Sequence, residues 1–115
     1  MIEIRLPFPP SVNAMYLNNQ GSGRGRVKSP EYRAWKDQAG WELNAQRPPK
    51  MEGRCTIEIH LDDKRQGDAD NRAKAVLDLL VEHGVLLRDS KKYVKGTYCG
   101  WETIEGCRVR IIPVE

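Results

Sequence analysis

The chain has 115 residues, 39% of them hydrophobic, which is typical of a folded domain and excludes a disordered tail. This length predicts one domain over residues 1–115. The longest apolar runs are three residues, whereas a membrane-spanning helix needs about 20. The start of the chain alternates charged with apolar residues and lacks the layout of a secretion signal. We therefore expect a cytoplasmic protein without a membrane partner.

The net charge of +3 is unevenly distributed along the chain. Residues 1–50 sum to +4, residues 51–90 to −3 and residues 91–115 to +2. A protein that holds a divalent cation against a polyanion needs this combination, because carboxylates bind the metal while Lys and Arg neutralise phosphates. A mixed, solvated surface gives the same balance at so small a net charge. Charge alone leaves both interpretations open.

The first 28 residues predict one strand followed by two irregular segments. Apolar and charged residues alternate over residues 2–6, which is the pattern of a half-buried strand, and prolines at positions 7, 9 and 10 end it. Residues 17–28 contain three glycines, and all their charges are positive. This composition favours a flexible loop that contacts phosphates over a simple connection between two elements.

A long helix is predicted from Ser29, which can cap its N-terminus, to about Gln46, where two further prolines follow. Its buried stripe consists of residues at helical spacing, namely Tyr32, Trp35, Ala39 and Leu43. Trp35 and Trp41 are six residues apart on this helix and therefore face different sides. We expect one of these tryptophans in the core and the other to be available to a partner.

The second half of the chain predicts three strands and one helix. The strand over residues 54–63 is apolar on one face and places His60 on the other, so His60 is expected on the solvent side or at an edge, and not as a ligand. The helix is predicted over residues 70–83, and its apolar stripe is Ala73, Val76, Leu77, Leu80 and Val81. The remaining strands are predicted near residues 93–99 and 107–114.

Three cysteines are widely spaced in the chain and form no Cys-x-x-Cys pair: Cys55, Cys99 and Cys107. Neither histidine lies at metal-ligand spacing from any of them. We therefore expect buried, reduced thiols and not a zinc site or a disulfide framework.

Two carboxylates, Asp68 and Asp70, lie where a loop leads into the second helix. In an extended chain, side chains at i and i+2 point to the same side with Cα atoms about 6.6 Å apart, which suits one hard cation. A helix cap needs one carboxylate and explains only one of the two. Lys74 and Asp78 follow at intervals of four residues along one helix ridge, where a surface salt-bridge ladder gives the same pattern.

Chain length connects this region with Asp89. The predicted helix is about 20 Å long, and residues 85–89 can extend back by about 17 Å. If they return antiparallel to the helix, Asp89 joins the two aspartates and Lys74 at its N-terminus. Carboxylate and water oxygens are the ligands that Mg²⁺ prefers. The cluster predicts metal-assisted hydrolysis of a phosphodiester, in which Lys74 offsets charge on the phosphate or orients the nucleophile.

Three blocks of sequence carry a family resemblance. They are Leu6-Pro7-Phe8-Pro9-Pro10-Ser11-Val12-Asn13, the block from Asp68 to Leu80 with the pattern D-x-D-N-x-x-K-x-x-x-D, and Val85-Leu86-Leu87-Arg88-Asp89-Ser90. In order and spacing they resemble the RusA family over nearly the whole chain. Members of that family are endodeoxyribonucleases that resolve Holliday junctions, and prophages often encode them.

The resemblance implies that Asp68, Asp70 and Asp89 bind Mg²⁺, for which Mn²⁺ can substitute, and that Lys74 is the motif lysine. Arg88 stands where the family often has a second aspartate. An organic cofactor is not implied. The implied fold is α+β, with a small mixed four-stranded sheet and two main helices.

The resemblance also implies an intertwined homodimer that cuts two opposed strands of a four-way junction during recombination and repair. A symmetric dimer suits a substrate with near-two-fold symmetry. From their charge, six residues are expected to bind the junction arms through backbone phosphates: Arg24, Arg26, Lys28, Lys91, Lys92 and Lys95.

Two other functions remain open from the sequence. The first is a less selective, structure-specific metal nuclease that acts on flaps or RNA hybrids. The second is a catalytically silent, dimeric protein that binds branched DNA, in which the aspartates only cap and pair. Binding alone gains nothing from carboxylates clustered near phosphates, which counts against the second alternative.

Overall fold

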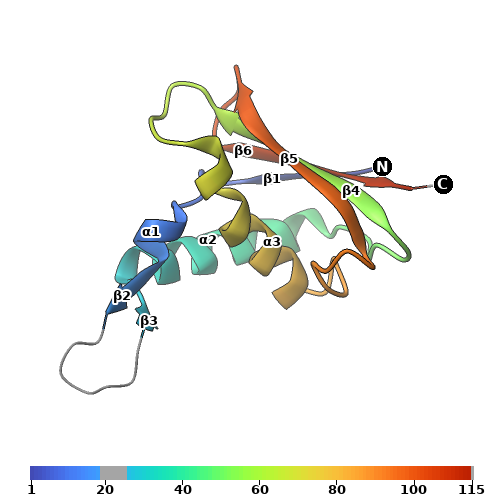
Figure 1. Cartoon of the computed structure of the whole chain (residues 1–115), viewed down its shortest axis with the longest axis horizontal. Coiled ribbons are helices and arrows are strands. Elements are labelled where there is room, and N and C mark those ends of the chain that lie inside the picture. The colour runs from blue at the N-terminus through green and yellow to red at the C-terminus, as the bar shows by residue number, and fades with distance from the viewer. Residues whose placement is uncertain (19–25, 115) are drawn as a thin grey trace.

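A mixed four-stranded sheet forms the centre of the computed structural model, which describes residues 1–18 and 26–114 (Figure 1). The strands lie side by side in the order β1 (Ile2–Leu6), β6 (Cys107–Pro113), β4 (Cys55–Asp62) and β5 (Val94–Glu102). β4 and β5 are parallel, and the other neighbours are antiparallel. The α+β fold with a mixed four-stranded sheet that the sequence predicts is therefore confirmed.

The bounds of the strands agree with the sequence patterns except at the end of β5. The apolar residues of β1, β4 and β6 alternate with polar ones, and their side chains are buried on one face of the sheet. The pattern predicts that the third strand ends near residue 99, but β5 continues to Glu102, which pairs with Asp62 of β4. The neighbouring strand supplies hydrogen-bond partners that the local sequence does not reveal.

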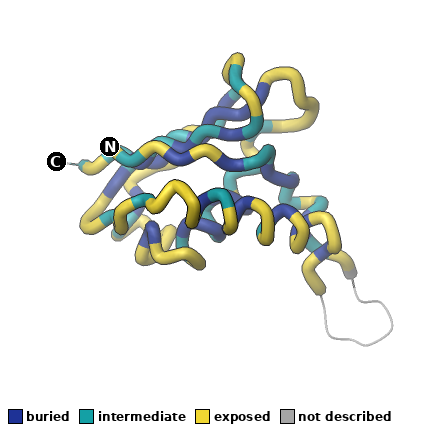
Figure 2. The backbone as a smooth tube through the Cα atoms, turned by 180° about the vertical axis from the view of Figure 1, so that it is seen from behind, coloured by how far each residue is buried: buried dark blue, intermediate teal, exposed yellow. Residues whose placement is uncertain are grey.

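The two main helices, α2 (Pro30–Gln46) and α3 (Ala73–Glu82), cover the same face of the sheet (Figure 1 and Figure 2). α2 has the predicted bounds, and the Oγ atom of Ser29 accepts a hydrogen bond of 3.0 Å from the backbone N–H of Tyr32. All four residues of its predicted stripe are buried. Trp35 is 7% exposed and Trp41 is 76% exposed, so the two tryptophans do face different sides.

The second helix differs from the prediction at its start and in its buried face. Residues Ala69–Asn71 form a 3₁₀ turn, η1, and α3 begins only after it. The residues of α3 that are fully buried are Ala75, Val76, Leu79 and Leu80, whereas Ala73, Leu77 and Val81 of the predicted stripe are only half-buried. α3 is the crossover between two parallel strands and also contacts α1 and α2, so it buries a different and wider face than a helix on the surface.

A short helix and a hairpin precede α2, and the sequence patterns do not predict them. They are α1 (Val12–Met15), β2 (Tyr16–Asn18) and β3 (Arg26–Lys28). The flexible loop expected over residues 17–28 is therefore partly strand, with Leu17 paired to Val27. Both of these side chains are exposed, so they carry no signal of a buried strand. In the described ranges, none of the helices has the length and apolar character needed to cross a membrane.

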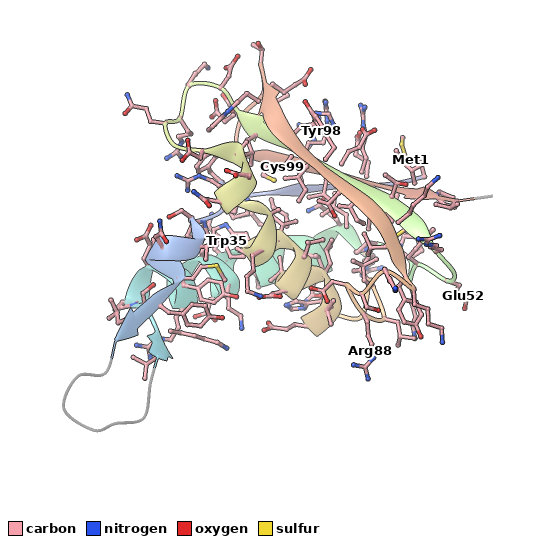
Figure 3. All side chains as sticks on the ribbon, in the orientation of Figure 1. Met1, Trp35, Glu52, Arg88, Tyr98 and Cys99 are labelled. Atoms are coloured by element: carbon pink, nitrogen blue, oxygen red, sulfur yellow. The ribbon has the colours of Figure 1, made fainter. Side chains whose placement is uncertain are left out.

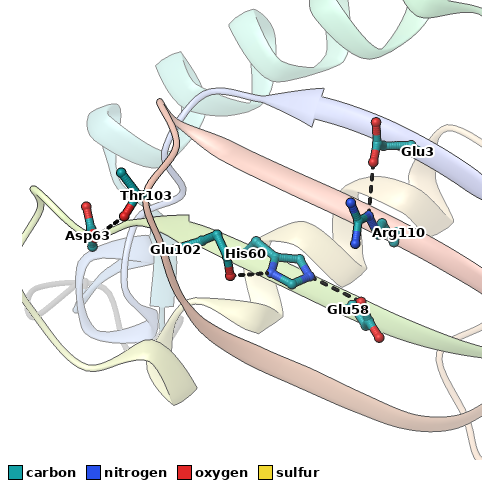
Figure 4. Close-up of polar contacts among 7 residues, drawn as sticks. All are labelled: Glu3, Glu58, His60, Asp63, Glu102, Thr103 and Arg110. Atoms are coloured by element: carbon teal, nitrogen blue, oxygen red, sulfur yellow. Dashed lines mark hydrogen bonds and ion pairs between the residues drawn. The ribbon is translucent and has the colours of Figure 1, made fainter.

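The face of the sheet that the helices do not cover carries a network of charged side chains (Figure 4). Arg110 donates from Nε to Glu3 over 3.0 Å. The ring of His60 lies between the carboxylates of Glu58 and Glu102, each 3.2 Å from one ring nitrogen. His60 lies on the predicted face, which the helices do not cover, but it is only 8% exposed. Cross-strand neighbours, including the Tyr98 ring, cover it.

Candidate active site

Asp68 and Asp70 lie in the connection that leaves the carboxyl end of β4 and leads to α3 (Figure 1, yellow-green). Asp68 has an extended backbone, with φ −100° and ψ 130°. Asp70 instead lies within η1, where the N–H of Arg72 donates to the carbonyl of Ala69 over 3.1 Å. The extended backbone expected at both positions is therefore found at Asp68 but not at Asp70. Both aspartates are exposed to solvent.

Helix capping explains neither aspartate in this structure. Asp68 occupies the N-cap position of η1 and Asp70 lies in its first turn, but the Asp68 side chain accepts no capping hydrogen bond. The residue at the N-cap of α3 is Arg72, and the first turn of α3 contains no acidic residue. The capping alternative left open by the sequence therefore has no support in the described part of the chain.

Lys74 and Asp78 form the predicted i, i+4 ion pair on α3, with Nζ 3.2 Å from an Asp78 carboxylate oxygen. Their hydrogen bond raises the pKa of Lys74, and the Asp78 charge adds to it. Tyr16 and Asp89 contribute further in the same direction. Lys74 therefore carries a positive charge at neutral pH.

The segment that carries Asp89 does not run back along α3 as an extended chain. The N–H groups of Val85 and Leu86 both donate to the carbonyl of Leu80, over 2.9 and 3.2 Å, and a second turn is closed at Ser90. Figure 3 places Arg88, the neighbour of Asp89, near the C-terminal end of α3. The premise of an antiparallel return is wrong because the chain turns before it can extend.

The three aspartates are consequently not gathered into one ligand cluster. Within residues 1–18 and 26–114, no group of three or more His, Cys, Asp or Glu side chains is arranged to hold a metal ion. The structure brings Lys74 together with Asp78, whereas Asp89 lies on the turns that follow α3. The assignment of Asp68, Asp70 and Asp89 as metal ligands stays a prediction.

Cys99 of β5 lies beneath η1 and supports it. Its Sγ atom donates to the carbonyl oxygen of Ala69, the residue between the two aspartates, over 3.0 Å. Burial raises the pKa of Cys99 to about 11, and the charge of Asp70 contributes. Cys99 is therefore a neutral thiol at physiological pH, which makes it a poor nucleophile and a poor metal ligand.

We expect iodoacetamide at pH 8 to label Cys99 at least ten times more slowly in the folded protein than in the chain unfolded by guanidinium. Only the thiolate reacts, and the thiolate fraction falls tenfold for each unit by which the pKa exceeds the pH. Because the pKa is raised, labelling of the folded protein should accelerate as the pH rises towards 11. Mass spectrometry of the labelled peptides measures both rates. Equal rates in the two states would contradict a half-buried, neutral thiol at Cys99.

The turn that contains Pro7, Pro9 and Pro10 forms one side of the region around Asp68 and Asp70. The sequence patterns did not predict this arrangement. Arg72 donates from Nη1 to the carbonyl of Pro9 over 2.8 Å and from Nη2 to that of Gln66 over 3.2 Å. Trp35 donates from Nε1 to the carbonyl of Pro7 over 3.1 Å. The turn is thus tied both to α2 and to the loop that carries Asp68. Arg72 and the prolines both belong to the blocks quoted above, but their contact spans 63 positions and has no local signal.

The basic residues predicted to bind DNA fall into two groups. Lys91, Lys92 and Lys95 surround the start of β5, at the end of the sheet opposite to the Asp68 loop. Lys28 lies on β3, exposed, and contact with the neighbouring Lys36 lowers the pKa of Lys28. Arg26 is also on β3, and Arg24 lies outside the described residues.

Three residues of α2 join Lys28 in a shallow pocket of about 200 Å³: the acidic Asp37 and two basic residues that sequence reasoning missed, Arg33 and Lys36. Arg33 and Lys36 lie on the helix beside the hairpin, and Lys36 also pairs with Glu82 over 2.7 Å. Their positions at i and i+3 on a helix were a signal for a shared basic face. The packing of β3 against this face could not be read from that spacing.

Comparison with known proteins identifies the family. The family model for endodeoxyribonuclease RusA matches residues 7–111, a range that contains Asp68, Asp70, Lys74 and Asp89. The crossover junction endodeoxyribonuclease RusA of Escherichia coli strain K12 is 36% identical over 95 residues, which cover 76% of this chain and 73% of the relative. The protein of the same name from Enterobacteria phage 82 is 34% identical with the same coverage. The chain belongs to the endodeoxyribonuclease RusA family.

Proposed function

We propose that this chain is a crossover junction endodeoxyribonuclease that hydrolyses phosphodiester bonds in four-way junction DNA with the help of a divalent metal ion. Family membership supports the nuclease activity, and the names of its relatives support the junction substrate. The observation that carries the proposal is the pair of exposed aspartates on one loop, neither of which has a capping role, with Lys74 one turn away.

Asp68, Asp70 and Asp89 would hold the ion, with Mg²⁺ preferred and Mn²⁺ as a substitute. Their carboxylates are hard oxygen donors, and all three are exposed, which fits a hydrated hard cation. To join the other two aspartates, the exposed residues 87–92, which include Asp89, would move towards the N-terminal end of α3, which leaves the buried residues Val85 and Leu86 in place. When bound, the ion would neutralise charge on the scissile phosphate and make water a better nucleophile.

The remaining residues of the site would position the substrate and hold charge. Lys74, kept protonated by Asp78, would neutralise a phosphate oxygen or orient the attacking water. Cys99 would hold the backbone between the two aspartates through its hydrogen bond to Ala69. The aspartates would then keep their spacing when the DNA binds.

A homodimer completes the proposal, because two opposed strands of a junction must be cut across a near-two-fold axis. Trp41, largely exposed on α2, is the aromatic side chain best placed to anchor a partner subunit. The basic groups around Lys28 and Lys91 would hold the junction arms by contacts with backbone phosphates, which read the shape of the DNA and not its bases.

The decisive experiment compares cleavage of four-way, Y-shaped and linear DNA with identical arm sequences, with and without Mg²⁺. We expect paired nicks in opposed strands of the four-way junction that require the metal ion. Equal rates on all three substrates would contradict junction selectivity and favour the less selective nuclease. Tight binding without cleavage under any metal would favour the catalytically silent DNA-binding protein.

A further inference from the structure

A pocket of about 290 Å³ lies beside the loop that carries Asp68, and the function proposed above does not use it. The proline turn, the start of α2 and the loop after β4 form its walls. Its lining residues are Phe8, Pro9, Pro10, Glu31, Trp35, Arg65, Gln66 and Arg72. The volume suits a phosphate with its sugar and is too small for a longer stretch of DNA.

Two guanidinium groups converge on this pocket over one aromatic ring. The Cζ atoms of Arg65 and Arg72 lie 5.1 and 4.7 Å from the centroid of the Phe8 ring, so they are within about 10 Å of each other. Within the described ranges, neither guanidinium has a carboxylate at ion-pairing distance, although Glu31 lies on the pocket wall. Two positive charges that line one pocket, neither paired with a carboxylate, give this pocket a positive potential that favours an anion.

The two arginines differ in their hydrogen bonds. Arg72 is occupied by the carbonyls of Pro9 and Gln66, which hold its charge in place. Arg65 is exposed, and no hydrogen bond from its guanidinium is found in the described residues. A guanidinium fork of this kind matches the oxygens of a phosphate in two parallel hydrogen bonds. Arg65 is therefore the group that can reach a ligand.

A stacked nucleobase fits this pocket less well than a phosphate does. The ring of Phe8 is already covered by the two guanidiniums and stacks with Trp101 at a centroid distance of 6.3 Å. The ring of Trp35 stacks with Tyr32 at 6.4 Å. Base recognition by stacking needs an open aromatic face, and these rings already have neighbours.

We propose that this pocket binds a backbone phosphate of the cleaved strand one or two nucleotides from the scissile phosphate, with Arg65 as the contacting residue. The proposal rests on the proposed function, because it takes Asp68 and Asp70 as the catalytic centre. Asp68 lies three positions after Arg65 in the chain, so their Cα atoms are about 10 Å apart at most. The contact fixes the register of the strand at the site and does so for any base sequence.

The test uses full-length protein and four-way junctions in which a single neutral methylphosphonate replaces one of the linkages adjacent to the cut. Binding is measured without metal, as a function of salt. At one or more of these positions, the neutral linkage should weaken binding by the unsubstituted protein and have no further effect on Arg65→Ala. Arg65→Ala should also lower the slope of log K against log salt by about 1 per chain.

Lys64→Ala is the matched control, because Lys64 is the neighbouring exposed cation but does not line the pocket. It should keep the sensitivity to the neutral linkage. The proposal is overturned if Arg65→Ala and Lys64→Ala respond alike at every position, or if the effect of Arg65→Ala depends on the bases beside the cut. Protein that binds junctions but cuts nothing would contradict the proposed function, and the phosphate contact of Arg65 would then be measured at the linkages that flank the crossover point.

Discussion

Asp70→Asn is expected to lower the metal-dependent cleavage of a synthetic four-way junction by on the order of 10²-fold or more. The substitution keeps the shape of the side chain and removes one anionic oxygen ligand, so the metal ion is held more weakly. Binding of the junction should stay intact or become tighter, because one negative charge near the phosphates is lost. Single-turnover cleavage and metal-free binding assays measure the two effects separately.

Asp63→Asn tests whether cleavage depends only on the total negative charge of the loop. Asp63 is exposed in the same connection and accepts a hydrogen bond of 3.0 Å from Thr103, but it lies outside the proposed ligand set. We expect cleavage close to that of the unsubstituted protein. Full activity of Asp70→Asn would remove Asp70 from the site. An equal loss in both variants would show that the charge of the loop matters and not the ligand.

Gly67→Ala should reduce cleavage by about 10- to 100-fold, because Gly67 sets the path of the backbone immediately before Asp68. Gly67 has φ +120°, which disfavours any side chain, and an added Cβ atom would lie 2.6 Å from Nη2 of Arg72. Arg72 must then shift, and its hydrogen bonds to Pro9 and Gln66 weaken. We expect the free energy of unfolding to fall by about 1–3 kcal/mol, as measured by urea denaturation.

Gly84→Ala separates backbone strain from the displacement of Arg72. Gly84 has φ +74°, but an added Cβ atom would meet nothing within 4 Å. This variant should lose stability and keep its cleavage rate at a temperature where both variants are folded. If Gly67→Ala cleaves as well as Gly84→Ala there, the Gly67 backbone does not position the aspartates.

Elements with strong local signals were predicted well from the sequence. The cap at Ser29 and the stripe that begins at Tyr32 define α2, because capping and helical spacing act within one or two turns. The alternation over β1 and β4 likewise indicates which side chains face the core. These signals depend on residues close together in the chain, so they can be recognised without knowledge of the tertiary structure.

Elements shaped by distant partners were predicted poorly. The hairpin of β2 and β3 exposes Leu17 and Val27, so neither strand shows the pattern of a buried face. The face that α3 buries follows from its position between the sheet and the other helices. His60 is covered by Glu58, Glu102 and Tyr98, two of which come from the neighbouring strand.

The sequence by itself determined the family blocks and the spacing of Asp68, Asp70 and Lys74, because each is encoded by residues near one another along the chain. The α+β class followed from the family that these blocks resemble. Only the tertiary structure decided that Asp89 follows a turn and not an extended return, and that Arg72 reaches Pro9. The physical reason is that turns closed by backbone hydrogen bonds and contacts across 63 positions depend on how the packed elements meet, which no local pattern records.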